Sequence, residues 1–146
     1  MVDCGARVWY NGVILGGGEG RGGVMKVYLS GGMHSEWRDQ VKASVQGDIS
    51  WLDPCLHGLG NPAEYTAWDL AAVRKCDVVF AYMETSNPSG VGLALEVGFG
   101  LALGKTVVLV DEKHDSSFAI VREAATLCYA RLIDGLGILV SLEKMQ

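Results

Sequence analysis

The segment 86–105 constrains the fold of this chain more than any other part of its sequence. It begins with turn-forming residues, Asn-Pro-Ser-Gly, and every residue of 91–103 is then apolar or glycine except Glu96. Apolar, strand-like runs stand on both sides of it, at 78–83 and 106–110. This order predicts a helix between two buried strands, and its apolar character predicts that the helix is covered all round.

Glu96 is a single carboxylate in this otherwise apolar helix. Burying an unpaired carboxylate costs free energy and tends to raise its pKa. A sequence keeps such a group either for a structural ion pair or for chemistry. The structural alternative pairs Glu96 with Lys105 or with an arginine from another helix.

The same segment resembles a known family. Its pattern Val-Gly-Leu-Ala-Leu-Glu-Val-Gly-Phe-Gly, followed by Leu-Gly-Lys and an apolar strand, is similar to that of the nucleoside 2-deoxyribosyltransferases. The resemblance covers roughly residues 26–112. It implies that Glu96 is the nucleophile that attacks the sugar C1′. It also implies a homo-oligomer with sites near the interface between subunits.

Composition and charge limit the remaining possibilities. The 146 residues are 49% hydrophobic and 20% charged, which indicates one soluble globular domain. The net charge of −5, without a basic run, argues against nucleic-acid polymers and anionic membranes as partners. A single nucleoside or nucleotide and a free nucleobase remain suitable partners.

Other sequence features favour a cytoplasmic protein. No apolar run reaches the length of a membrane span, and the N-terminus does not read as a signal peptide. The four cysteines are widely spaced and form no Cys-x-x-Cys pair, which favours reduced thiols. Cys55 and His57 could suggest a metal site, but two ligands at this spacing are a weak signal. We expect no metal and no cofactor.

Residues 1–24 are expected to form an extension before the main domain, 25–146. The stretch 7–15 reads as a hairpin with an Asn-Gly turn, and 16–23 is a glycine-rich linker. The linker is not a phosphate-binding loop, because the Gly-Lys-Ser/Thr ending is missing.

Strands and helices alternate along the main domain. This alternation predicts a flavodoxin-like three-layer α/β sandwich with a five-stranded parallel sheet in the order 2-1-3-4-5. Ser35 is the expected N-cap of the first helix. The expected strands are 26–30, 48–52, 77–83, 106–110 and 125–130, and the expected helices are 35–45, 63–75, 91–103, 118–124 and 132–145.

The first strand leads to a candidate site. Small residues, including Gly31 and Gly32, follow it and allow close approach of a ligand at the carboxyl edge of the sheet. The resemblance implies that Tyr28, in this strand, hydrogen-bonds the nucleophile. An ordinary core tyrosine is the alternative reading.

Asp69 is the second candidate carboxylate. It shares a helix face with apolar residues at Ala72, Val73 and Cys76, where aspartate is a poor helix former. An aspartate at the edge of this stripe, reaching water, is the structural alternative. The resemblance implies that Asp69 contacts substrate and acts as an acid.

The loop 84–90 departs from the family pattern. The best-known transferases carry a base-binding aspartate six residues before the nucleophile, where this chain has Gly90. Ser86 and Ser89, close to a helix N-terminus, could bind a phosphate, and related deoxynucleoside 5′-phosphate N-hydrolases have a comparable stretch. We count Gly90 and Gly92 among the candidate substrate contacts.

Two further serines, Ser116 and Ser117, follow the fourth expected strand. The resemblance implies that a polar side chain in this region reaches into a neighbouring subunit's site. Capping of the next helix is the alternative role.

These features predict a nucleotide-salvage enzyme that cleaves an N-glycosidic bond through a glycosyl-Glu96 ester and transfers 2-deoxyribose to another base. Hydrolysis of 2′-deoxynucleoside 5′-phosphates is the alternative reaction. A nucleotide-binding or sensing domain without turnover, or a flavin-binding flavodoxin-type protein, would be alternatives of other classes. The short Ser-Gly-Gly turn after the first strand disfavours flavin.

Overall fold

A computed structural model of the chain describes residues 23–146. The expected N-terminal extension and its hairpin therefore lie outside the described residues, apart from residues 23 and 24. Within the described range, none of the helices combines the length and the apolar character needed to cross a membrane.

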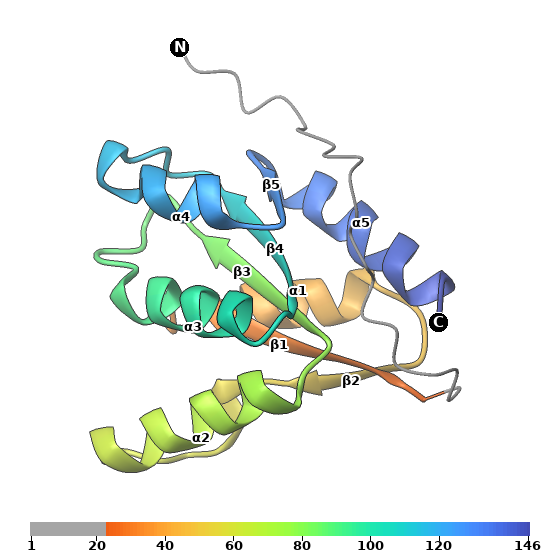
Figure 1. The fold of residues 1–146 in the computed structure, drawn as a ribbon, viewed down its shortest axis with the longest axis horizontal. Coiled ribbons are helices and arrows are strands. Elements are labelled where there is room, and N and C mark those ends of the chain that lie inside the picture. The colour runs from red at the N-terminus through yellow and green to blue at the C-terminus, as the bar shows by residue number, and fades with distance from the viewer. Residues whose placement is uncertain (1–22) are drawn as a thin grey trace.

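The core is one parallel sheet with the strand order β2-β1-β3-β4-β5, which confirms the predicted order (Figure 1). In β1, Tyr28 pairs with Leu52 of β2 and with Val79 of β3. All six residues of β3 are buried, as expected for a strand that is covered on both faces. The strands are β1 (Met25–Gly31), β2 (Ile49–Leu52), β3 (Val78–Met83), β4 (Thr106–Asp111) and β5 (Leu127–Tyr129).

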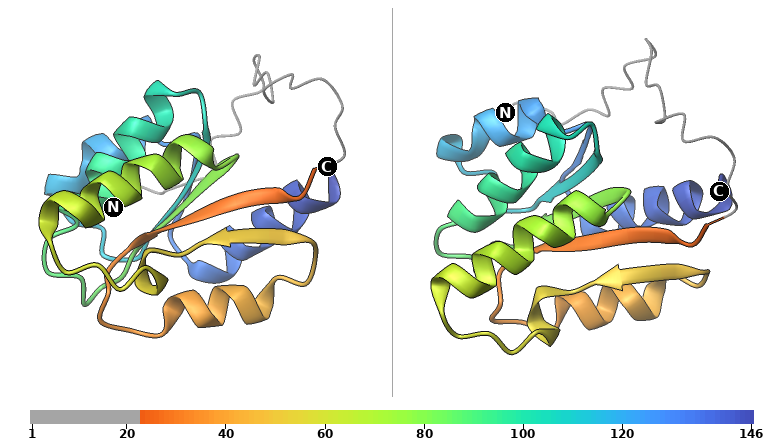
Figure 2. Two further views of the ribbon diagram at one scale, coloured as in Figure 1. Left: turned by 90° about the horizontal axis from the view of Figure 1, so that it is seen from below. Right: turned by 60° about the horizontal axis from the view of Figure 1, so that its bottom comes forward.

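Helices cover both faces of this sheet, which confirms the three-layer arrangement (Figure 2). On one face lie α2 (Pro62–Lys75), α3 (Val91–Ala102) and α4 (Ala119–Ala124). On the other face lie α1 (Trp37–Ser44) and α5 (Leu132–Lys144). Two single-turn 3₁₀ helices, η1 (Pro54–Leu56) and η2 (Ser116–Phe118), stand in the connections.

The alternation of side chains along β1 assigns its residues to the two faces. Val27 and Leu29 point toward α1 and α5, whereas Tyr28 packs with residues of α2 and α3. Ser30, two residues after Tyr28, lies on the same face as Tyr28, because the side-chain period of a strand is two. The α2–α3 face therefore receives the polar end of β1.

The sequence predicted the start of α2 correctly but not the start of α1. Asn61 caps α2 through a hydrogen bond from the Ala63 amide, and Pro62 occupies the first turn. The prediction that Ser35 caps α1 is wrong. The helix begins two residues later, and the Ser35 hydroxyl donates instead to the Glu84 carboxylate at 2.5 Å.

The prediction that α3 is covered all round is also wrong for the single chain. One side of the helix is buried, and Gly100 is needed there because a Cβ would lie 2.9 Å from Val79 Cγ2. The opposite side leaves Val91 and Leu95 exposed by 73% and 55%. An apolar face of α3 therefore stays uncovered by the described chain.

Candidate active site

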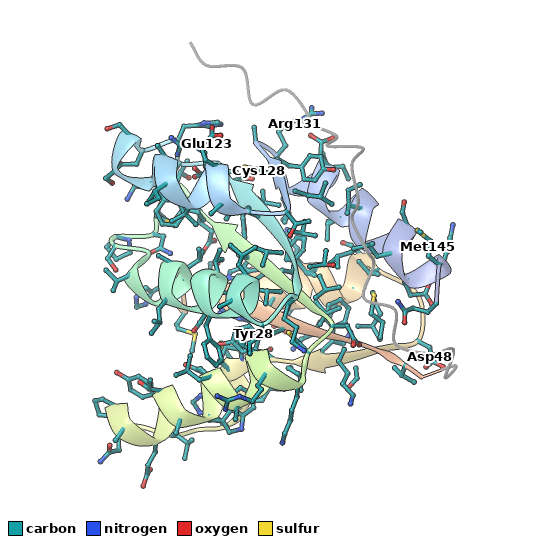
Figure 3. The ribbon with its side chains drawn as sticks, viewed as in Figure 1. Tyr28, Asp48, Glu123, Cys128, Arg131 and Met145 are labelled. Carbon is teal, nitrogen blue, oxygen red and sulfur yellow. The ribbon has the colours of Figure 1, made fainter. Side chains whose placement is uncertain are left out.

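Three ionisable side chains from three separate elements meet between α2, α3 and the sheet. Tyr28 comes from β1, Asp69 from α2 and Glu96 from α3, and each alters the pKa of another. Figure 3 places Tyr28 between the ribbons of α2 and α3. The three residues that the sequence singled out as catalytic candidates are thus brought together by the fold.

Glu96 is a half-buried carboxylate of α3. Its pKa is raised to about 7, chiefly by burial and also by the charge of the neighbouring Asp69, while a hydrogen bond from the Ser30 hydroxyl acts in the opposite direction. None of the ion pairs formed within residues 23–146 includes Glu96, so the alternative of a pair with Lys105 is not formed. A carboxylate near its titration point at neutral pH is suited to chemistry.

Tyr28 is fully buried, and its hydroxyl has no hydrogen-bond partner among the described residues. Burial raises its pKa, and the nearby carboxylates of Glu96 and Asp69 raise it further. The phenol therefore remains protonated and can act only as a neutral donor toward a carboxylate or a substrate oxygen.

Asp69 lies in the middle of α2, with its side chain 17% exposed. Burial raises the pKa of its carboxyl, and the nearby imidazole of His57 counteracts this effect. Its atom Oδ1 is buried without a hydrogen-bond partner and lies 3.6 Å from His57 Nε2. A carboxyl with a raised pKa is suited to hold a proton for a leaving group.

The buried side-chain atoms that lack a partner are informative as a group. In the described chain they are Tyr28 OH, His57 Nε2 and Asp69 Oδ1, and all belong to this cluster. Buried polar atoms are paired in nearly all of a native protein, so exceptions that gather at one place indicate a functional site.

Ser30 is a site residue that the sequence analysis did not select. It is completely buried, and its hydroxyl donates to Glu96 Oε2. This bond fixes one oxygen of the carboxylate and favours its ionised form. The signal was available, because Ser30 follows Tyr28 by two residues on the same face of β1.

Arg38 is a second residue that the sequence analysis did not select. Its guanidinium is buried below the turn after β1 and donates to the carbonyls of Leu29, Gly31 and Gly32, the last at 2.7 Å. It also lies 3.5 Å from Asp53. Arg38 thus holds the glycine turn in place from the side of the sheet opposite to Glu96.

The two glycines of this turn sit close to other parts of the carboxyl edge. Gly31 has φ of +152°, and a Cβ there would lie 2.6 Å from the Tyr82 carbonyl oxygen. A Cβ on Gly32 would lie 3.3 Å from Glu84 Oε2. Gly31 is therefore required by the backbone, as expected for a close approach.

Gly90 is the N-cap of α3 and adopts a left-handed conformation with φ of +70°. A Cβ at this position would lie 2.7 Å from Met83 Cε and 3.1 Å from Phe118 Cε2. An aspartate at Gly90 would therefore strain the backbone and collide with the core. Gly92 differs, because a Cβ there would meet nothing within 4 Å.

The serines of the β3–α3 loop are exposed, and Ser89 is partly engaged already. Its hydroxyl accepts a hydrogen bond from the Val91 amide at 3.4 Å, and its own amide donates to Asn87 Oδ1. Ser86 lies nearer to β3 in the same loop. Five residues of helical rise, roughly 7.5 Å, separate Val91 at the start of α3 from Glu96.

Ser116 and Ser117 lie in η2 and are exposed. The Ser117 hydroxyl donates to Asp115, which caps this turn, so the capping device uses Asp115 rather than a serine. Within residues 23–146, no hydrogen bond joins either serine to Tyr28, Asp69 or Glu96. The fold therefore does not bring these two serines into the cluster of one chain.

No set of three or more His, Cys, Asp or Glu side chains in the described range is arranged to hold a metal ion. His57 packs edge-on against Trp68 instead, with ring centroids 4.8 Å apart. Cys55 is exposed and reduced.

Comparison with known proteins places this geometry in context. The sequence model of the family described as "Nucleoside 2-deoxyribosyltransferase like" matches residues 24–114, which include the whole cluster. A search of curated protein sequences finds no match.

Among solved structures, the chain is similar to a 2-desoxiribosyltransferase from Leishmania mexicana, with a TM-score of 0.61 and 15% identity over 80% of this chain and 97% of that one. It is also similar to a 2-deoxyribosyltransferase from Bacillus psychrosaccharolyticus, with a TM-score of 0.60 and 18% identity over 75% and 88%. A CMP N-glycosidase from Clostridium botulinum has a TM-score of 0.54 and 17% identity over 80% and 98%. At these identities the likeness shows a shared fold.

Proposed function

The chain belongs to the nucleoside 2-deoxyribosyltransferase-like family, and from this premise we propose that it is an enzyme that moves 2-deoxyribose from one nucleobase to another. The observation that carries the proposal is Glu96, a half-buried carboxylate without an ion-pair partner in the described chain and with a pKa of about 7, beside Asp69 and Tyr28. The related solved structures include proteins named as deoxyribosyltransferases, which supports this choice.

The proposed reaction begins when ionised Glu96 attacks C1′ of a 2′-deoxynucleoside. The bond from C1′ to the base nitrogen breaks while the new C1′–O bond forms, and the base receives a proton from Asp69. A glycosyl-Glu96 ester results. A second base then attacks C1′, returns its proton to Asp69 and releases Glu96 as a carboxylate.

Ser30 and Tyr28 support this chemistry by hydrogen bonding. Ser30 holds Glu96 Oε2, which leaves the other oxygen, Oε1, to attack. The Tyr28 hydroxyl, buried and unpaired, can donate to the carboxylate as charge changes during the reaction. Neither residue needs to lose a proton.

Hydrolysis is the second candidate reaction, and Gly90 favours it. The backbone conformation and close contacts of Gly90 leave no room for the base-binding aspartate of the transferases. Exposed Ser86 and Ser89, with Gly92 at the start of α3, could hold a 5′-phosphate in that case. The similarity to a protein named as a CMP N-glycosidase supports this alternative.

Product analysis distinguishes the two reactions. Purified protein is incubated with a panel of 2′-deoxynucleosides and their 5′-monophosphates, with and without excess free adenine or cytosine. Transfer predicts a new nucleoside that appears faster than free sugar. Free sugar or sugar phosphate alone, with Ser89→Ala raising KM for monophosphates only, would establish hydrolysis. No release of base from any member of the panel would favour a binding or sensing domain.

We also propose that the enzyme is a cytoplasmic homo-oligomer that acts in nucleotide salvage. The uncovered apolar face of α3, with Val91 and Leu95, and the exposed Ile120 of α4 are the surface that a second copy would cover. Ser116 and Ser117 stand beside α4 and would approach a neighbouring site. Light scattering at micromolar concentration should give at least a dimer, and Leu95→Glu should shift the mass to that of a monomer.

A further inference from the structure

His57 lies beside the cluster but has no role in the proposed reaction so far. It follows η1 in the connection between β2 and α2, and its side chain is only 8% exposed. Its ring is held against Trp68 of α2 in an edge-on contact. A polar ring that is buried and fixed in this way is built into the structure rather than left on its surface.

The hydrogen bonds of the ring assign its neutral tautomer. Nδ1 accepts a hydrogen bond from the Leu59 amide at 2.9 Å. A neutral imidazole that accepts through Nδ1 carries its proton on Nε2. His57 therefore presents an N–H donor on the side opposite to Leu59.

That donor faces Asp69. Nε2 lies 3.6 Å from Asp69 Oδ1, and both atoms are buried without a partner. The separation is longer than a hydrogen bond, but a shift of less than about 1 Å would pair the two atoms. Catalytic hydrogen bonds are often long in a protein without its substrate and shorten when substrate binds.

Resting on the proposed function, we propose that His57 is the positioning residue for the acid Asp69. Its Nε2–H binds Asp69 Oδ1, so that the transferable proton of the carboxyl is carried by Oδ2. As the bond from C1′ to the base breaks, this proton moves from Oδ2 to the base nitrogen. The carboxylate that remains keeps its hydrogen bond from His57 until the incoming base returns a proton.

The surroundings of Asp69 show why this donor matters. The other groups that face the carboxyl are Tyr28 from β1, Glu96 from α3 and, farther away, Arg38 from α1. Burial raises the pKa of Asp69, and His57 is the strongest influence that lowers it. Without His57, Asp69 would lose both its fixed orientation and the strongest influence that lowers its pKa.

Two substitutions test the two ring nitrogens of His57 separately. In His57→Gln the amide nitrogen lies close to the position of Nε2 and can still donate to Asp69. In His57→Asn the amide lies close to the position of Nδ1, so it can serve Leu59 but does not reach Asp69. Melting temperatures of both variants show whether each one is folded.

We expect His57→Asn to lower kcat on the best substrate of the panel by about 10- to 100-fold, the range for a misplaced catalytic group, with KM within about threefold. His57→Gln should recover most of that loss. In an Asp69→Asn background, His57→Asn should have little further effect. Equal losses in both His57 variants, or an undiminished loss in the Asp69→Asn background, would overturn the proposal.

A spectroscopic measurement tests the same contact without turnover. The ¹⁵N chemical shifts of the His57 ring at pH 8 should show the tautomer with the proton on Nε2. The ¹³C carboxyl titration of Asp69 should move to higher pH in His57→Asn and less far in His57→Gln, which keeps the donor to Asp69 but lacks the charge that an imidazole can carry. A proton on Nδ1, or no change in Asp69, would refute the role of His57. Failure of the proposed function would appear separately, as normal spectra without release of any base.

Discussion

Two carboxylate regions lie on opposite faces of the same sheet edge. Cationic side chains pair with the carboxylate of one region, whereas the other region lacks such partners. On the α1 side, Asp53 is 4% exposed and meets both Lys42 and Arg38. Although burial alone would raise its pKa, the hydrogen bonds from Lys42 and from the Cys55 amide hold the pKa of Asp53 below its usual value. This region is a structural ion pair.

On the α2–α3 side, Glu96 and Asp69 have no cationic partner of comparable strength. Burial raises the pKa of both carboxyls, and unpaired polar atoms gather around them. The contrast shows that burial alone does not mark a catalytic carboxylate. The decisive property is burial without a compensating cation.

The largest expected effect is on turnover. Glu96→Gln should lower kcat by at least about three orders of magnitude, because it removes the attacking group. Initial rates of base release on the best nucleoside measure the effect. Glu64→Gln, at an exposed position in the first turn of α2, serves as the matched control and should keep wild-type activity. Activity of Glu96→Gln within tenfold of wild type would contradict the assignment.

The second effect concerns stability and the opposite face. Arg38→Met should lower the free energy of unfolding by about 3–5 kcal/mol, because the carbonyls of the glycine turn and Asp53 lose a buried partner. Urea denaturation at pH 7 measures the change. Arg74→Met is the control, since Arg74 is exposed and only lies over the Phe99 ring, so it should cost less than about 1 kcal/mol. Equal losses in the free energy of unfolding for the two variants would contradict the structural role of Arg38.

The third effect is a dependence of stability on pH that should differ between the two faces. The pKa of Glu96 is raised in the folded state to about 7, so the folded protein binds the extra proton and loses stability as pH rises from about 4.5 toward 7. Glu96→Gln should remove this loss, and should therefore stabilise the protein by up to about 3 kcal/mol at pH 8 and by little at pH 4.5.

Asp53→Asn should behave in the opposite way. The folded-state pKa of Asp53 is lowered, so its contribution is present above the unfolded pKa and disappears as pH falls through the folded value. The substitution should cost about 1–3 kcal/mol at pH 7 and less as the solution becomes acidic. Melting curves of both variants from pH 4 to pH 8 measure these effects. If the change in stability varied with pH in the same direction for both variants, the contrast between the two faces would be wrong.

The smallest expected effect is a shift in a pH–rate profile. The Ser30 hydroxyl favours ionised Glu96, so Ser30→Ala should raise the pKa of Glu96 and move the acidic limb of kcat/KM to higher pH by about one unit or less. The wild-type limb should lie near pH 7. A limb that stays in place would mean that Ser30 does not bind the nucleophile in solution.

The fold could be predicted from the sequence because strand and helix patterns alternate clearly. The buried run of β3, the Asn61-Pro62 helix start and the apolar helix around Glu96 each carry a local signal. The coverage of α3 could not be predicted from these signals. An apolar helix face indicates that cover is favourable, but it does not say that the same chain supplies the cover.

The candidate site was predictable only in part. Glu96 and Asp69 were visible as carboxylates among apolar residues, whereas Tyr28 was selected from the family resemblance. His57 and Arg38 could not be selected, because their roles come from contacts with distant segments and from backbone carbonyls that any sequence would offer. Ser30 depends on a contact 66 residues away, although its place two residues after Tyr28 was a usable clue.

The central claim is that Glu96 forms a covalent ester with the sugar. A 2′-deoxy-2′-fluoroarabinonucleoside tests it directly, because the electron-withdrawing fluorine slows the breakdown of a glycosyl ester. Mass spectrometry of the protein after incubation, followed by peptide mapping, should show one fluorosugar on the peptide that contains Glu96, and none in Glu96→Gln. Release of base without any adduct, or an adduct on another residue, would contradict the account.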